Sequence, residues 1–193
     1  RKIFLHSVDY SRFIHTIKLL LLTGSATEQA KKNQGLALGK GFAHRIDILC
    51  YCLMPNHYHF LLYQKSDYGI SEFMHNLNTS YTMAFNKKNH RTGRLFENTF
   101  RAKQIESDDQ LLHVSRYIHL NPLLANLVNT PELYPWSSYS EYIRKLQETL
   151  CSTNQIAQQF PNQEAYKQFI MEHIPEARRQ KELKIELEEA QFS

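Results

Sequence analysis

The residues with the clearest chemical potential are two histidines, His57 and His59, separated by a single tyrosine. They lie in residues 50–63, an almost wholly apolar and aromatic run typical of β-strands, interrupted by Met-Pro-Asn. Alternate residues of a strand point to the same face, so both imidazoles can reach one divalent metal ion. Neutral histidine is the commonest metal ligand in proteins. The pair therefore predicts a metal site, although two strand histidines with ordinary hydrogen bonds would show the same pattern.

A second group of chemically capable residues follows about sixty positions later. Tyr117 and Asn121 are four residues apart, and His113 precedes Tyr117 by the same spacing, so a helix places all three on one face. A tyrosine hydroxyl can act as a covalent nucleophile. Its pKa is about 10, so it needs an activated target, such as a phosphoryl group polarised by a metal that Asn121 helps to bind. Tyr117 as a packing residue, and Asn121 as a cap before Pro122, remain open interpretations.

The most basic part of the chain is residues 86–103. Its cationic residues, opposed by the single acid Glu97, are Lys87, Lys88, Arg91, Arg94, Arg101 and Lys103. Basic groups that contact phosphates, together with aromatic rings that stack on unpaired bases, suit single-stranded or hairpin nucleic acid. Arg101 and Lys103 are the best individual candidates. The alternative is a solubilising turn and strand edge.

Composition limits the class of protein. The chain has 193 residues, which suits one domain with an appendage, and a formal net charge of +4 permits a polyanionic partner. Three cysteines, Cys50, Cys52 and Cys151, do not form a disulfide framework and are expected to be reduced. No apolar run reaches membrane-spanning length and no signal peptide is visible, so we expect a cytoplasmic, nucleoid-associated protein with no membrane partner.

Hydrophobic periodicity predicts an α+β fold. The expected helices and strands are helix 7–22, strands 42–54 and 57–63, helix 69–89, a strand-like segment 95–105, a helix from Ser107 to about Leu120, and a separate helix 123–127. Residues 23–40 are expected to be loop with a helical piece. This order gives an antiparallel sheet covered by helices, and a strand before residue 1 would complete a ferredoxin-like, split β-α-β pattern.

Two blocks of the sequence are similar to the signature blocks of one family, the IS200-like tyrosine transposases, and especially to their REP-associated branch. The blocks are residues 53–62, Leu-Met-Pro-Asn-His-Tyr-His-Phe-Leu-Leu, and residues 116–122, Arg-Tyr-Ile-His-Leu-Asn-Pro. Further colinear motifs extend the resemblance over roughly residues 1–142. We therefore expect a transposase (HUH nuclease) domain at residues 1–144 and a C-terminal helical extension at 145–193. Family members usually begin with a further strand that has no counterpart here, and truncation of the chain is our interpretation.

The resemblance implies specific roles. His57 and His59 match the histidine-hydrophobe-histidine pair that binds Mg²⁺ or Mn²⁺, Tyr117 matches the single nucleophilic tyrosine, and Asn121 falls where the family often has a third metal ligand. The implied activity is cleavage and rejoining of single-stranded DNA, at hairpin or palindromic repeats, through a 5′-phosphotyrosine. Related proteins include both monomers and homodimers.

Three rival functions fit the same residues. The first is a non-catalytic nucleic-acid-binding module on the same scaffold, which predicts that Tyr117→Phe leaves function intact. The second is a metal-dependent nuclease in which water attacks in place of Tyr117. The third is a domesticated enzyme that processes genomic repeats and no longer moves an element.

Overall fold

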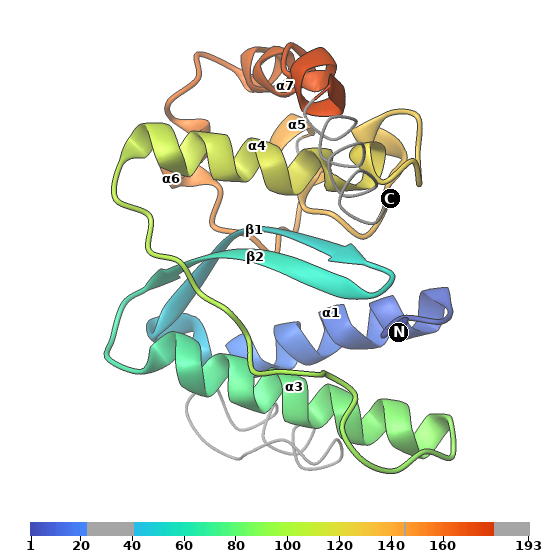
Figure 1. Ribbon diagram of the computed structural model, residues 1–193. Helices are drawn as coiled ribbons and strands as arrows, with labels where there is room; N and C mark the ends of the chain where they lie inside the picture. The colour runs from blue at the N-terminus through green and yellow to red at the C-terminus, as the bar shows by residue number, and fades with distance from the viewer. Residues whose placement is uncertain (23–40, 145, 180–193) are drawn as a thin grey trace, which may run out of the picture. The chain divides into compact units, whose positions relative to one another are not determined.

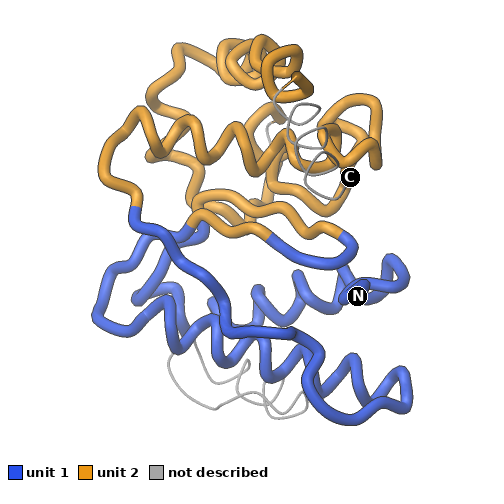
Figure 2. The backbone as a smooth tube through the Cα atoms, viewed as in Figure 1, with its two compact units in different colours: residues 1–48, 55–58, 62–104 blue, residues 49–54, 59–61, 105–193 orange. Residues whose placement is uncertain are grey.

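The structure is a computed structural model that describes residues 1–22, 41–144 and 146–179 (Figure 1). The chain forms two compact units (Figure 2). Unit 1 comprises Arg1–Ile48, Pro55–Tyr58 and Leu62–Gln104, and unit 2 comprises Leu49–Met54, His59–Leu61 and Ile105–Ser193. The expected loop 23–40 lies outside the described residues. The predicted domain boundary at residue 144 stays a prediction, although the contacts group residues 105–144 with the segment that follows them.

An antiparallel β-hairpin supplies residues to both units. Strand β1, Ile46–Met54, pairs with β2, His57–Gln64, across the two-residue connection Pro55-Asn56. The predicted hairpin is confirmed, but its first strand begins four residues later than expected. A short 3₁₀ helix, Phe42–His44, precedes it, closed by the Arg45 N–H, which donates to the Phe42 carbonyl at 2.8 Å. Nearly every residue of β1 is buried, as expected for an apolar run without alternation.

Unit 1 is built on two helices, α1 (Ser7–Leu21) and α3 (Gly69–Lys88), which pack against each other. Both predicted helices are confirmed. They form here because apolar residues recur at helical spacing, which gives each helix a face that can be buried. An aromatic cluster of Phe4, Phe13 and Tyr81 forms the core, with the Phe13 and Tyr81 rings edge-to-face at 4.9 Å. The Tyr81 hydroxyl is buried and donates to the Ile3 carbonyl at 2.6 Å.

In unit 1 a buried carboxylate pairs with a partly exposed lysine. The side chain of Asp9, in the first turn of α1, accepts from the N–H groups of Leu5 and His6 at 2.9 Å, and from Lys88 Nζ at 2.6 Å. Burial by itself raises the pKa of Asp9, but the hydrogen bonds from Lys88 and the two backbone groups lower it below its ordinary value. The pair joins the start of α1 to the end of α3.

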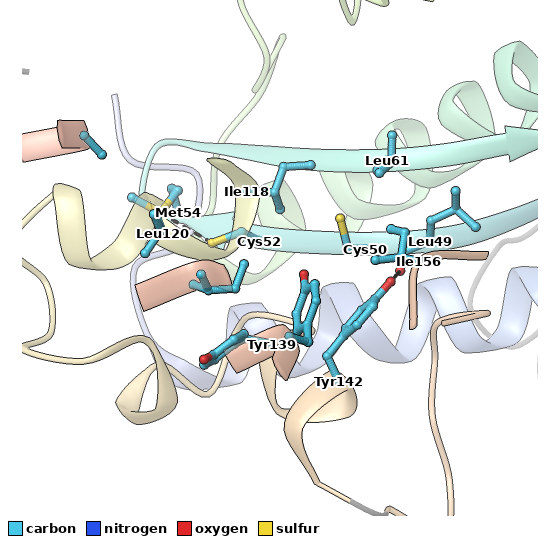
Figure 3. Packing of buried hydrophobic residues seen from close by; sticks show 13 residues of the cluster. Leu49, Cys50, Cys52, Met54, Leu61, Ile118, Leu120, Tyr139, Tyr142 and Ile156 are labelled. Atoms are coloured by element: carbon cyan, nitrogen blue, oxygen red, sulfur yellow. Dashed lines mark hydrogen bonds between the residues drawn. The ribbon is translucent and has the colours of Figure 1, made fainter. Parts of the chain in front are cut away.

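Unit 2 contains helices α4 (Asp108–Leu124), α5 (Tyr139–Ile143), α6 (Asn154–Ala157) and α7 (Gln163–Met171), and a 3₁₀ helix, Pro131–Leu133. Its core joins β1 residues to side chains from these helices (Figure 3). The Tyr142 hydroxyl donates to the Leu49 carbonyl at 2.6 Å. Residues 136–138 run beside β1, where Leu53 N–H donates to the Trp136 carbonyl and Ser138 N–H to the Tyr51 carbonyl.

Two predicted elements are wrong. No strand occurs in residues 95–105, where most side chains are exposed and do not alternate with buried ones. The expected separate helix 123–127 does not form, because α4 continues through Pro122 to Leu124. Proline disrupts a helix interior, but here only two helical residues follow it, and burial of Pro122 and Leu123 in unit 2 offsets the lost N–H.

The α+β class is confirmed, with the hairpin and several helices in the order helix, strand, strand, helix. The described residues contain the two strands of the hairpin, so the full split β-α-β pattern stays a prediction. Among the described residues, no helix is long and apolar enough to cross a membrane.

Candidate functional site

Helix α4 carries two of the predicted site residues. Ser107 caps its N-terminus by accepting from the Gln110 N–H at 3.2 Å, and Asp108 and Asp109 in the first turn favour the positive end of the helix dipole. One face of α4 is buried in unit 2, which leaves the opposite face in contact with solvent. Tyr117 lies on that outer face with 53% of its surface exposed. Its phenol is therefore accessible to a large substrate.

Unit 2 brings three of the four predicted site residues together. The rings of His59 and Tyr117 meet edge-to-face, with centroids 5.5 Å apart and planes at 80°. Asn121 lies one helical turn after Tyr117, and its Nδ2 donates to the Tyr117 backbone carbonyl at 2.8 Å. That bond uses Nδ2 as the donor and leaves Oδ1 as the side-chain atom able to accept a hydrogen bond or to bind a metal.

His57 precedes His59 by two positions on β2 and belongs to unit 1. Its Nδ1 shares a hydrogen bond with Asn56 Oδ1 at 2.8 Å. An amide oxygen only accepts, so Nδ1 carries the proton and Nε2 carries the lone pair that a metal needs. Partial burial lowers the pKa of His57, which favours the neutral, metal-binding form at neutral pH.

The donor set fits a divalent cation of the predicted kind. Within the part of the chain that the structure describes, no three His, Cys, Asp or Glu side chains form a metal-binding cluster. A metal held by the ring nitrogens of His57 and His59 therefore needs oxygen ligands as well, such as the Asn121 amide oxygen and oxygens of a phosphate or of water. Such a mixed set suits Mn²⁺ or Mg²⁺, which accept carbonyl-type and water ligands, and imidazole nitrogen favours Mn²⁺ of the two.

Tyr117 differs from most tyrosines of the chain. The tyrosines at 51, 81, 139, 142 and 166 are buried, and burial raises their pKa values, so they are poor nucleophiles. Tyr63 and Tyr68 are exposed like Tyr117, but both lie in unit 1 at the end of β2 and just before α3. Exposure together with the His59 contact distinguishes Tyr117 from the other ten.

The basic residues predicted to bind DNA lie in unit 1. Lys87 and Lys88 occupy the last turn of α3, where Lys88 pairs with Asp9 and Lys87 is exposed. The Arg91 guanidinium lies 5.8 Å from the centre of the Phe85 ring. The remaining three, Arg94, Arg101 and Lys103, are exposed in irregular chain. Their contacts with DNA stay a prediction.

One aromatic residue of this basic segment is part of the core. Phe96 packs edge-to-face on Tyr58, with ring centroids 5.8 Å apart, and also contacts Tyr81. It therefore contributes to the packing of unit 1, and Phe100 is the half-buried aromatic side chain that remains for contacts with bases.

A buried polar group near Tyr117 was not assigned by the sequence. His119 is completely buried, with Nδ1 2.7 Å from the Tyr166 hydroxyl and Nε2 2.9 Å from Ser138 Oγ. Burial lowers its pKa to about 3, so it is neutral at physiological pH. Its partners are 19 and 47 residues away in the chain, and no local spacing signals that contact.

Comparison with known proteins finds a match to a family model. No curated protein and no solved structure matches the chain significantly. A family model described as "Transposase IS200 like" matches residues 28–121, the segment that contains His57, His59, Tyr117 and Asn121. The match covers slightly less than half of the chain and does not distinguish the REP-associated branch, so it shows that residues 28–121 are similar to IS200-like transposases.

Proposed function

We propose that the protein is a metal-dependent, single-strand DNA transposase or endonuclease that cleaves and rejoins DNA through a covalent bond to Tyr117. The family match supports a transposase role, and the sequence blocks around His57 and Tyr117 favour the REP-associated branch. The observation that carries the proposal is the contact between an exposed Tyr117 and His59, with Asn121 bonded to the same helical turn.

The proposed step is an in-line transfer of a phosphoryl group. Tyr117 Oη forms a bond to the backbone phosphorus, and the bond between phosphorus and O3′ breaks. The phenolic proton passes through water to the departing 3′ oxygen, which leaves as a hydroxyl, while the 5′ phosphate remains on the protein. Because the bond energy is conserved, a 3′-hydroxyl can reverse the step and join strands without a nucleotide cofactor.

The residues of the site have separate tasks. His57 and His59 would hold the cation on one face of β2, and Asn121 would offer Oδ1 to it from α4. When bound there, Mg²⁺ or Mn²⁺ would supply Lewis-acid polarisation of the phosphate and would neutralise charge in the transition state. His59 would therefore have two tasks. It would bind the cation, and its edge-to-face contact with Tyr117 would hold the phenol beside that cation.

Substrate binding is assigned to the exposed basic residues. Arg94, Arg101 and Lys103, with Lys87 and Arg91, are proposed to contact phosphates of a single-stranded or hairpin DNA, with the protein acting as monomer or homodimer. Lys88 contributes less to this surface than the others, because its ammonium group is bonded to Asp9.

Covalent trapping tests the proposal. Purified protein is incubated with Mn²⁺ or Mg²⁺ and with 5′- or 3′-labelled single-stranded hairpin DNA from the flanks of its own gene, and denaturing gels report DNA-linked protein. We expect a metal-dependent adduct with the 3′-labelled DNA and none with the 5′-labelled DNA, because Tyr117 would be joined to the fragment on the 3′ side of the cut. Tyr117→Phe should abolish it, and His57→Ala should lower its rate at least about 100-fold. Tyr68→Phe, which removes the hydroxyl of another exposed tyrosine, is the matched control and should react normally.

Other outcomes assign the rival functions. Cleavage without an adduct that survives Tyr117→Phe identifies a nuclease in which water attacks. Tight DNA binding without any cleavage, in either metal, identifies a non-catalytic binding module. Either result overturns the proposed function.

A further inference from the structure

Helix α7 contacts α4 at residues on both sides of Tyr117. The Arg116 guanidinium, directly before Tyr117, lies 4.4 Å from the centre of the Phe169 ring. His119, two residues after Tyr117, is bonded to the Tyr166 hydroxyl at 2.7 Å. Both partners belong to α7, which lies beyond the segment 28–121 that matches the family model. The helix that carries the proposed nucleophile is therefore held by a part of the chain outside that match.

The bonds around His119 have a defined direction. Ser138 Oγ accepts from the Tyr51 N–H at 2.9 Å and donates its only proton to the Tyr51 carbonyl at 3.2 Å. It can then only accept from His119 Nε2, which lies 2.9 Å away. His119 Nδ1 is consequently the acceptor for the Tyr166 hydroxyl at 2.7 Å, a shorter contact than the 3.4 Å from the same hydroxyl to Ser115 Oγ. Every polar atom of the buried imidazole has one partner, so the ring has one orientation.

The contact at Arg116 is similarly specific. Arg116 is buried, and its Nη2 lies 2.6 Å from His113 Nδ1 while its Cζ lies over the Phe169 ring. A cation over an aromatic face is stabilised by the ring quadrupole, most strongly when water is excluded. Phe169 therefore holds the residue next to Tyr117 in a fixed position.

Together these contacts help to hold the rotation of α4 about its own axis, beside Ile118 and Leu120, which pack in the core of unit 2. A helix with its side chains has a radius of about 5–6 Å, so a rotation of about 10° moves an outward group by about 1 Å. Misplacement by about 1 Å can reduce a rate about 100-fold. The setting of α4 thus controls where the Tyr117 phenol lies relative to His59.

We propose that α7 is a positioning element for Tyr117, with Tyr166 and Phe169 as its positioning residues. This inference rests on the proposed function of Tyr117 as the nucleophile. It predicts that the chain beyond the matched segment is needed for the rate of the covalent step, in addition to any contribution it makes to stability.

Single-turnover kinetics in the full-length protein separates the two roles. The rate of adduct formation is measured at saturating hairpin DNA with Mn²⁺ and divided by the folded fraction from circular dichroism, beside the Kd for the same DNA. We expect Tyr166→Phe and Phe169→Leu each to lower the rate about 10-fold, with Kd changed less than about 2-fold. Gln168→Ala, on the exposed face of the same helix, should leave both values unchanged.

The outcomes distinguish this inference from the proposed function. If the wild-type protein forms the adduct and both α7 variants react at the wild-type rate per folded molecule, α7 is merely structural and the inference fails alone. If Tyr166→Phe does not fold, Phe169→Leu decides the question by the same comparison. A wild-type protein that forms no adduct overturns both the proposed function and the inference.

Discussion

Unit 1 and unit 2 each bury an ionisable side chain, and they accommodate it in opposite ways. Asp9 in unit 1 keeps its charge, because Lys88 and two backbone N–H groups compensate for lost water. His119 in unit 2 is neutral, because burial removes water from the imidazole and its two hydroxyl partners carry no counter-charge. A charge can be buried where a counter-charge is available, whereas burial without one favours the uncharged form of a group. The two units should therefore respond differently to acid and to loss of a partner.

The largest expected effect is the acid sensitivity that His119 confers. Its folded-state pKa of about 3 lies below the ordinary value of 6.5, so below pH 6.5 the unfolded chain binds a proton that the folded chain does not. The contribution of His119 to the free energy of unfolding is fully present above pH 6.5. It falls by up to about 1.4 kcal/mol per pH unit as the pH drops towards 3. Urea unfolding between pH 7 and pH 4 measures this slope. Over two pH units the loss approaches about 3 kcal/mol.

Substitution isolates the contribution of His119 from those of other groups. His57 and His173 also have lowered pKa values, through partial burial, but they titrate equally in the wild-type protein and in a variant changed at His119. His119→Gln should flatten the profile by nearly one proton, whereas His15→Gln, at an exposed position, should retain the wild-type slope. Parallel profiles for wild type and His119→Gln would show that His119 is not the buried neutral group described. Asp9, by contrast, loses its contribution only as the pH falls below about 3.8, its ordinary value.

The second effect is the loss of the buried ion pair in unit 1. Lys88→Met keeps the aliphatic stem but leaves the 3%-exposed Asp9 carboxylate without a counter-charge, so we expect unfolding to require about 2 kcal/mol less free energy. This is below the usual cost for a fully buried pair because Lys88 is 36% exposed. Urea unfolding at pH 7 measures it, with Lys87→Met, one exposed position earlier, as the control. Equal stability of Lys88→Met and Lys87→Met would show that Lys88 has no structural role. Lys88 would then be as good a candidate for DNA binding as Lys87.

The sequence predicted the elements whose burial follows a local period. Helices α1 and α3 were predicted because the spacing of their apolar residues decides which face is buried, and the hairpin because two apolar, strand-forming runs flank a Pro-Asn turn. The roles of His59 and Tyr117 come from the family resemblance and stay predictions, although the structure brings their two rings into contact. The helices and the hairpin depend on short-range patterns, so the sequence contains them directly.

The remaining features depend on contacts between distant residues. Asn121-Pro122 favours a helix boundary by local preference, but burial of Pro122 and Leu123 in unit 2 continues α4. The bonds of His119 to Ser138 and Tyr166 require residues far apart in the chain, and no spacing rule connects them. Residues 95–105 contain strand-forming types, yet no partner strand is present among the described residues. Tertiary packing overrides local preference in each case.

The smallest expected effect concerns an ion pair that is not buried. Arg45 and Glu72 form a bidentate pair at the surface of unit 1, where Glu72 is 53% exposed. Arg45 has further bonds to Ser66 Oγ at 3.1 Å and to the Asp67 carbonyl at 2.9 Å, which remain when the carboxylate is removed. Glu72→Gln should therefore shift the urea midpoint far less than Lys88→Met does, because solvent screens an exposed pair. About 1 M salt should remove the remaining difference.

The test compares Glu72→Gln with Glu97→Gln, an exposed glutamate in the irregular segment of the same unit. Nearly equal midpoints for these two variants, both close to wild type, would attribute the stability of unit 1 to burial of Asp9 and not to charge pairing in general. A Glu72→Gln variant as unstable as Lys88→Met, at low and high salt alike, would contradict that attribution. It would show instead that the contacts of Arg45 with Glu72, Ser66 and Asp67 are as important to the stability of unit 1 as the buried Asp9 carboxylate.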